Sequence, residues 1–282
     1  MRARTDDGVE LHWESHGEGE PLLLLHEFGG DHRSWRPQVA HFSRRYRCLV
    51  YDARGYPSSD VPTDPDAYSQ ERAVADALCV LDAAGESSAH VVGNSMGGFA
   101  TLHLGLRHPD RTRSLVVAGC GYGAHPDQDA AFRAESRELS RRYADEGSAA
   151  VAADYGAGPG RLFLKDKDPA GYAEHLAVLA EHDPTGAGLT MAGVQASRPS
   201  LYDLRDDLAR MDVPTLIVAG DGDDGILDVD VMLRRTLPRA GLAVLPRSGH
   251  LTNLEEPALF NALVEQFHAQ VAAGRWARPS QE

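Results

Sequence analysis

The chain has 282 residues, of which 42% are hydrophobic and 25% charged, an ordinary globular composition that gives no support to a disordered or fibrous protein. The formal net charge of −14 argues against nucleic acid and anionic membranes as partners, because phosphate binding needs clustered Lys and Arg. The polar start and the lack of a run of about 20 apolar residues predict a cytoplasmic protein without a membrane span.

The cysteines and paired histidines do not form a metal or disulfide pattern. Cys48, Cys79 and Cys120 are odd in number and widely spaced, so we expect reduced thiols. His12 and His16 lack a helical context for metal binding. We therefore expect no cofactor and no metal.

Short runs rich in Val, Leu and Ile alternate with longer helix-periodic stretches. This order predicts a mostly parallel sheet with helices on both faces. After an edge strand at 9–14, the predicted strands are 21–25, 48–51, 90–92, 115–118, 215–219 and 243–245. The predicted helices are 33–42, 67–84, 96–107, 228–238 and 257–273. Asp31 is placed to cap the first helix, and Pro257 suits the first turn of the last one.

Residues 122–205 interrupt this alternation with helix formers, scattered aromatic residues and Gly-Pro breaks. We predict a mostly helical cap over the carboxyl ends of the strands, where open α/β sheets bind ligands. Its many aromatic side chains favour a lid that sets substrate choice. The predicted organisation is a core at 1–121 and 206–274, a cap at 122–205 and a loose tail at 275–282.

Ser95 stands in a Gly93-x-Ser95-x-Gly97 motif, directly after an apolar run and directly before a predicted helix. In this context two glycines allow strand and helix to approach closely, and the serine is held on a sharp turn with its hydroxyl exposed. We therefore predict that Ser95 is a nucleophile.

A serine hydroxyl needs a base and the base needs an acceptor that fixes its tautomer. His250, in the loop between the last predicted strand and the last helix, is the predicted base. The loop after strand 215–219 offers three carboxylates, Asp221, Asp223 and Asp224. A calcium loop is disfavoured because Gly225 stands where a ligand belongs and no Glu stands at the twelfth position.

With these motifs the sequence resembles the α/β-hydrolase superfamily, in the branch of small capped esterases, enol-lactonases and carbon–carbon bond hydrolases. The resemblance covers nearly the whole chain except the cap, and it implies an α/β-hydrolase fold with the chain order Ser, Asp, His. It also implies Asp223 as the acid, counted three residues from Gly220, with Asp224 second and Asp221 third.

The same resemblance implies an oxyanion hole made by the backbone amides of Phe28 and Met96. Glu27 departs from the family, which has glycine at this position. The Asp52-Ala53-Arg54-Gly55 turn resembles a family element that supports the neighbouring loop. Glu27 and Arg54 are our candidate substrate contacts, although we favour a structural Glu27 that points away from the pocket and pairs with Arg54 or Arg33.

The function implied is hydrolysis of a carboxylic ester or lactone of a small organic substrate through an acyl-enzyme on Ser95. Two alternatives stay open at this point. The same residues could cleave a carbon–carbon bond or perform perhydrolysis, and the loop from Phe28 to Asp31 with Trp35 resembles that of hydrolase-like signalling receptors. We expect a monomer or a homodimer.

Overall fold

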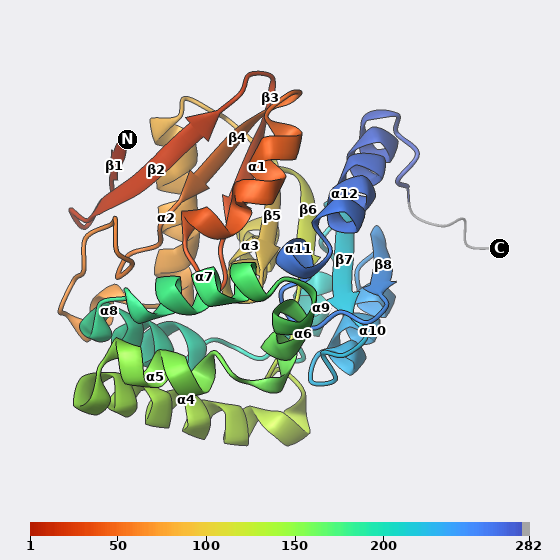
Figure 1. Cartoon of the computed structure of the whole chain (residues 1–282). Coiled ribbons are helices and arrows are strands. Elements are labelled where there is room, and N and C mark those ends of the chain that lie inside the picture. The colour runs from red at the N-terminus through yellow and green to blue at the C-terminus, as the bar shows by residue number, and fades with distance from the viewer. Residues whose placement is uncertain (278–282) are drawn as a thin grey trace.

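The computed structural model of the protein describes residues 1–277, so 278–282 of the predicted tail lie outside the described residues. Within residues 1–277, eight strands form one sheet in the order β1-β2-β4-β3-β5-β6-β7-β8 (Figure 1). The strands are β1 Arg2–Arg4, β2 Glu10–His16, β3 Glu20–Leu25, β4 Tyr46–Tyr51, β5 Ala89–Asn94, β6 Thr112–Ala118, β7 Thr215–Gly220 and β8 Ala240–Leu245. β2 pairs antiparallel with β1 and β4, and the strands from β4 to β8 are parallel. The predicted mostly parallel sheet is therefore confirmed.

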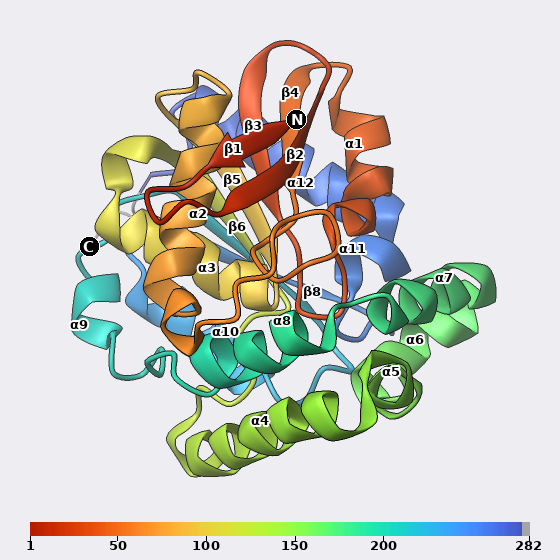
Figure 2. The ribbon, with the colours of Figure 1, turned by 90° about the vertical axis from the view of Figure 1, so that its left-hand side faces the viewer.

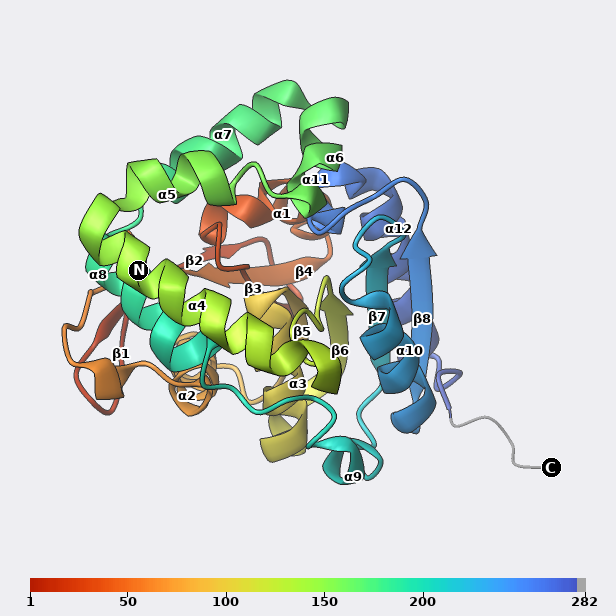
Figure 3. The same cartoon turned by 90° about the horizontal axis from the view of Figure 1, so that it is seen from below.

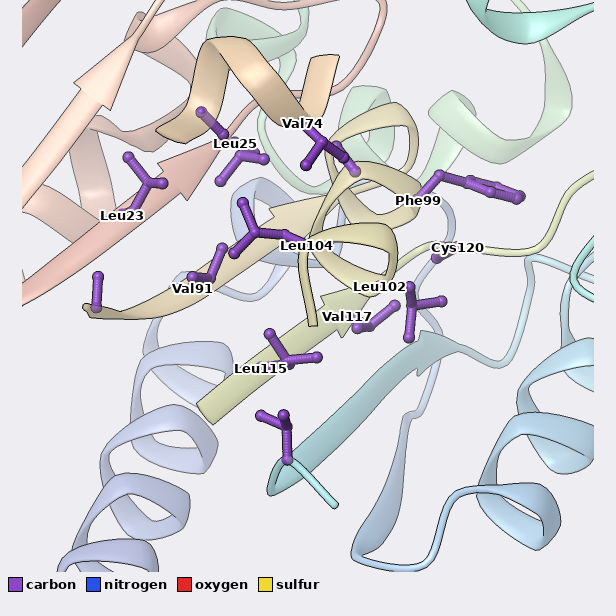
Figure 4. Close-up of a cluster of buried hydrophobic side chains, with 14 of the residues drawn as sticks. Leu23, Leu25, Val74, Val91, Phe99, Leu102, Leu104, Leu115, Val117 and Cys120 are labelled. Carbon is purple, nitrogen blue, oxygen red and sulfur yellow. The ribbon is translucent and has the colours of Figure 1, made fainter. Parts of the chain in front are cut away.

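Helices cover both faces of this sheet. Successive strand side chains point to opposite faces, and the apolar side chains on each face pack against helices. Leu22 and Leu24 of β3 pack against α1 (Arg36–Phe42) and α12 (Pro257–Ala272). Leu23 and Leu25 join the cluster of α2 (Gln70–Ala83), α3 (Met96–Arg107) and α10 (Leu227–Thr236). Figure 2 shows α2 and α3 on one side of the sheet and α1 and α12 on the other, and Figure 4 shows the side chains around α3.

The helix ends follow the capping residues that the sequence offers. Asp31 accepts a hydrogen bond from the Arg33 amide and caps a 3₁₀ helix, η1 (His32–Trp35), after which Arg36 begins α1. Pro257 stands in the first turn of α12. Both expected start signals are confirmed, but the single predicted helix 33–42 is divided in two. The other short helices are η2 Pro65–Ala67, η3 Pro109–Arg111, α9 Arg205–Leu208, which begins at the last residue of 122–205, and α11 Thr252–Glu255.

The segment 122–205 is helical and lies across one end of the sheet (Figures 1 and 3). It consists of α4 Pro126–Glu146, α5 Ser148–Tyr155, α6 Pro159–Lys167, α7 Pro169–Ala180, α8 Pro184–Leu189 and a π-helix, η4, at Thr190–Gln195. Tyr143, Val151 and Met191 of this segment pack with Phe28 and Met96, which follow β3 and β5. The segment therefore covers the carboxyl ends of these strands.

No helix within residues 1–277 is both long and apolar enough to cross a bilayer.

Candidate active site

Ser95 occupies a strained turn between β5 and α3. Its φ of 53° and ψ of −114° are unusual for a residue with a side chain. A Cβ on Gly93 would lie 2.2 Å from the Gly97 oxygen, and a Cβ on Gly97 would lie 2.1 Å from the Leu25 oxygen. Both glycines are therefore required for β3, β5 and α3 to meet at this point, and the Ser95 amide is held by the Ala118 oxygen at 2.8 Å.

The structure brings Ser95, His250 and Asp223 together from the ends of three different strands. The Ser95 hydroxyl donates to His250 Nε2 at 2.8 Å, and His250 Nδ1–H donates to Asp223 Oδ2 at 2.6 Å. Asp221 instead accepts a hydrogen bond from the Ser248 amide, at 3.2 Å, and Asp224 is exposed. Of the three candidate carboxylates, Asp223 is thus the one at the histidine.

The backbone on both sides of His250 is fixed by a residue that the sequence analysis did not single out. Glu255, 5% exposed, accepts hydrogen bonds from the Gly249 amide at 2.5 Å and the Leu251 amide at 3.0 Å. The His250 amide itself donates to the Gly160 oxygen at 2.8 Å. Burial raises the pKa of the Glu255 carboxyl, although the two amides act in the opposite direction. Glu255 is the last residue of α11 (Thr252–Glu255), so this short helix returns its side chain to the loop of His250.

Phe28, which follows β3, and Met96, the first residue of α3, belong to one buried cluster. The Tyr56 hydroxyl is 3.1 Å from the Phe28 oxygen and 3.8 Å from Met96 Sδ. Met96 is the first residue of α3, where a backbone N–H has no partner within the helix. Among the described residues no backbone carbonyl accepts from the Phe28 amide. Neither amide therefore has a backbone hydrogen-bond partner among the described residues.

Glu27 is buried but does not line the cavity at Ser95. Its Oε1 accepts a hydrogen bond from the Ser34 hydroxyl at 2.9 Å, and His175 Nδ1 lies 3.8 Å away. Burial lowers the pKa of His175 to about 3, so this ring is neutral. The predicted ion pair of Glu27 with Arg33 or Arg54 is wrong, because both arginines bind other carboxylates.

The two arginines expected beside Glu27 have other partners. Arg33 pairs with Asp31 and Glu181, each at 2.7 Å. Arg54 pairs with Asp76 at 2.7 Å and Asp7 at 2.7 Å, and it also donates to the Ala67 oxygen at 2.9 Å. These bonds occupy the guanidinium of Arg54. They connect it to Asp7 in the turn between β1 and β2, to Ala67 in η2 and to Asp76 in α2. Arg54 does not line the cavity that contains Ser95.

A cavity of about 900 Å³ lies above Ser95 and His250. Residues of α4, α5, α6 and η4 form most of its remaining wall. Two buried arginines, Arg161 and Arg198, belong to this wall and were not found by sequence reasoning. No local motif marks them, since their position depends on how the helices of 122–205 pack.

The groups that could hold a metal ion lie elsewhere in the described chain. His12, Glu14 and His32 have ligand atoms within 4.8 Å of one another. Glu14 already accepts hydrogen bonds from His12 at 3.2 Å and from His16 at 2.9 Å. These residues stand on β2 and η1 and do not line the cavity at Ser95.

A mostly parallel sheet with a serine on a sharp turn after a central strand, and a histidine and a carboxylate at the ends of later strands, defines a class of α/β hydrolases. The sequence model of the alpha/beta hydrolase fold matches residues 20–257. The chain belongs to this family.

Similar proteins come from several bacteria. The chain is 30% identical over 270 residues to a protein of Azorhizobium caulinodans named carbamate hydrolase RutD, covering 93% of this chain and 96% of the relative. It is 30% identical over 280 residues to 2-hydroxymuconate semialdehyde hydrolase of Pseudomonas putida, covering 94% and 93%. The crystal structure of the enol-lactonase from Burkholderia xenovorans LB400 superposes with a TM-score of 0.80 at 25% identity, over 95% of this chain and 100% of that chain. All three are named as hydrolases or as a lactonase.

Proposed function

We propose that the protein is a serine hydrolase that cleaves a carboxylic ester or lactone of a small organic substrate through an acyl-enzyme on Ser95. The observation that carries this proposal is the hydrogen-bonded chain from Ser95 through His250 to Asp223, at 2.8 and 2.6 Å. A serine hydroxyl becomes a nucleophile when a neighbouring base takes its proton. The cavity directly above the three residues has room for a small substrate.

In the proposed reaction Ser95 Oγ attacks the carbonyl carbon while His250 Nε2 takes the hydroxyl proton. Asp223 holds the imidazole with Nδ1–H toward its carboxylate and stabilises the imidazolium that forms. The amides of Phe28 and Met96 receive the developing oxyanion. His250 then protonates the leaving alcohol, and water releases the acid by the reverse sequence of proton transfers. The helices of 122–205 act as a cap that shapes the cavity.

A second candidate is hydrolysis of a carbon–carbon bond by the same residues. The relative from Pseudomonas putida favours it, since 2-hydroxymuconate semialdehyde, which gives that protein its name, contains no ester or lactone bond. The enol-lactonase neighbour favours the first candidate. A screen of nitrophenyl esters, lactones and dienone acids against the purified protein separates the two candidates by comparing kcat/KM for each bond type.

The test of the proposal is turnover of a 4-nitrophenyl ester by wild type, Ser95→Ala and His250→Ala. Loss of either group should lower kcat by about 10⁶, as in other enzymes of this mechanism. Circular dichroism should show that both variants are folded. Either variant retaining a tenth of the wild-type rate on every substrate would contradict the proposal. If the wild-type protein bound a ligand tightly but showed negligible turnover, it would be a receptor.

A further inference from the structure

Arg161 and Arg198 are buried cations that have no carboxylate partner. Their exposed fractions are 8% and 7%, and no carboxylate oxygen of residues 1–277 lies within 4.0 Å of either guanidinium. A buried charge is costly unless it is paired. Arg54, which is buried to a similar degree, shows what is normal in this protein, since it binds both Asp7 and Asp76.

The hydrogen-bond partners of the two arginines within residues 1–277 are neutral groups, and Arg161 Nη1 donates to the Tyr155 oxygen at 3.5 Å. Arg198 lies 3.5 Å from the ring centre of Phe99 and donates to the Tyr122 oxygen at 2.8 Å and to Gln195. Burial lowers its pKa to about 9, so it remains a cation at neutral pH. Arg161 lies 4.2 Å from the ring centre of Tyr155, and its Nε is buried without a hydrogen-bond partner in the described structure.

Both side chains line the cavity that contains Ser95, and each contacts or adjoins a residue that is hydrogen-bonded to the backbone of Ser95 or His250. The ring under Arg198 belongs to Phe99, whose amide donates to the backbone carbonyl oxygen of Ser95 at 3.0 Å. Arg161 directly follows Gly160, whose oxygen accepts from the His250 amide at 2.8 Å. Arg198 therefore stacks on a residue of the first turn of α3, and Arg161 is the neighbour in sequence of the residue that binds the His250 backbone. Acidic residues of the same wall, such as Glu135 and Glu138, are exposed to solvent.

We propose that Arg161 and Arg198 form a binding site for a carboxylate of the substrate, separate from the bond that is cleaved. The substrate class is thus a small ester or lactone that carries a free carboxylate. A guanidinium presents paired donors that match the two oxygens of a carboxylate, and the aromatic rings behind each arginine keep its plane fixed. The bound carboxylate supplies the negative charge that the protein itself does not place beside these cations. This inference names the substrate of the hydrolase site and rests on the proposed function.

The test compares two esters with the same leaving group, the mono-4-nitrophenyl ester of glutaric acid and the neutral 4-nitrophenyl butyrate. Wild type should prefer the anionic ester in kcat/KM. Arg198→Met and Arg161→Met should each lower this preference about 10- to 100-fold, mainly through KM, as expected for loss of a hydrogen bond to a charged group. Arg198→Lys should restore part of it. Arg142→Met is the matched control, because Arg142 lines the same cavity but is paired with Glu146 and Asp154.

A binding measurement separates failure of this inference from failure of the proposed function. Isothermal titration calorimetry of wild type with glutarate should show binding that both methionine variants lose and Arg142→Met keeps. Hydrolysis of the neutral ester with no preference for the anionic one and no glutarate binding would overturn the carboxylate site while leaving the hydrolase. Arginine-dependent glutarate binding without hydrolysis of any ester would support the site and reject the proposed reaction.

Discussion

The identity of the carboxylate beside His250 is decided by the backbone of one turn. The Asp223 amide donates to the Gly220 oxygen at 3.2 Å, and the Gly222 amide donates to the Ser248 oxygen at 2.8 Å. These bonds pack the turn after β7 against the loop that carries His250. The third residue after Gly220 then faces the histidine, whereas its neighbours Asp221 and Asp224 face solvent.

Replacement of this carboxylate should impair the reaction without unfolding the protein. We expect Asp223→Asn to lower kcat by about 10⁴, because an amide no longer holds His250 in the tautomer that accepts the serine proton. Asp224→Asn is the control and should change kcat little. Steady-state kinetics on a 4-nitrophenyl ester measures both effects, and equal losses in the two variants would contradict the assignment.

Glu255 should act as a positioning residue for His250. Removing its carboxylate in Glu255→Ala frees the amides of Gly249 and Leu251, so the imidazole can move away from Ser95. A displacement of about 1 Å can cost about 10²-fold in rate, which is the size of the kcat loss we expect. Glu256→Ala is the neighbouring control, since Glu256 pairs with Lys167 at the surface. A kcat unchanged in Glu255→Ala would refute this role.

For single residues, local sequence motifs were sufficient to predict the position of some side chains in the site but not of others. Ser95 and His250 stand in motifs that fix their place relative to a strand and a helix. The partner of Glu27 could not be predicted, because Ser34 and His175 reach it from η1 and α7. Arg161 and Arg198 could not be found either, since a lone arginine in a helical stretch carries no sign of which wall it will face.

At the scale of helices and strands, the apolar runs located each central strand but underestimated its length. β6 begins at Thr112, and its polar residues Arg113 and Ser114 were not expected to be in a strand. Pairing with β5 extends it, because a neighbouring strand supplies hydrogen bonds whatever the side chain. The π-helix at Thr190–Gln195 was also unexpected, since its backbone pattern leaves no periodic signal in six residues.

The contact between α3 and the end of β3 has a direct test. Gly97→Ala places a methyl group against backbone oxygens of Leu25 and His26, neither of which can move away easily. We expect a loss of about 3 kcal/mol or more in the free energy of unfolding, at the upper end for overpacking. In Gly105→Ala, on the same helix, the new methyl meets the flexible ends of Leu115 and Met211 and should cost less. Urea unfolding measures both, and a reversed order would contradict the packing described.

For the whole molecule, buried histidines should make stability depend on pH. His103 is 1% exposed, and burial lowers its pKa to about 4 from 6.5. Between these two pKa values the unfolded chain binds more protons than the folded one, so this histidine lowers stability as the pH falls from 6.5 toward 4. His175 and His182, with pKa values lowered by burial to about 3 and about 4, act in the same direction.

The contribution of one histidine can be isolated with His103→Leu. Relative to wild type, this variant should gain about 2 kcal/mol in the free energy of unfolding between pH 8 and pH 5, since each unit of pKa shift corresponds to about 1.4 kcal/mol. Urea unfolding of both proteins at the two pH values gives the difference. If the difference between the proteins stayed the same at pH 8 and pH 5, the buried histidine would not be linked to stability.

Every step of the proposed reaction depends on Ser95 as the nucleophile. The most direct measurement is covalent labelling with diethyl 4-nitrophenyl phosphate, followed by intact mass and peptide mapping. We predict one diethyl phosphoryl group per chain, attached to Ser95, and a loss of esterase activity proportional to the fraction of labelled protein. The Ser95→Ala variant should form no adduct. The His250→Ala variant should be labelled slowly. An adduct on another residue, or full activity in protein labelled at Ser95, would contradict the account.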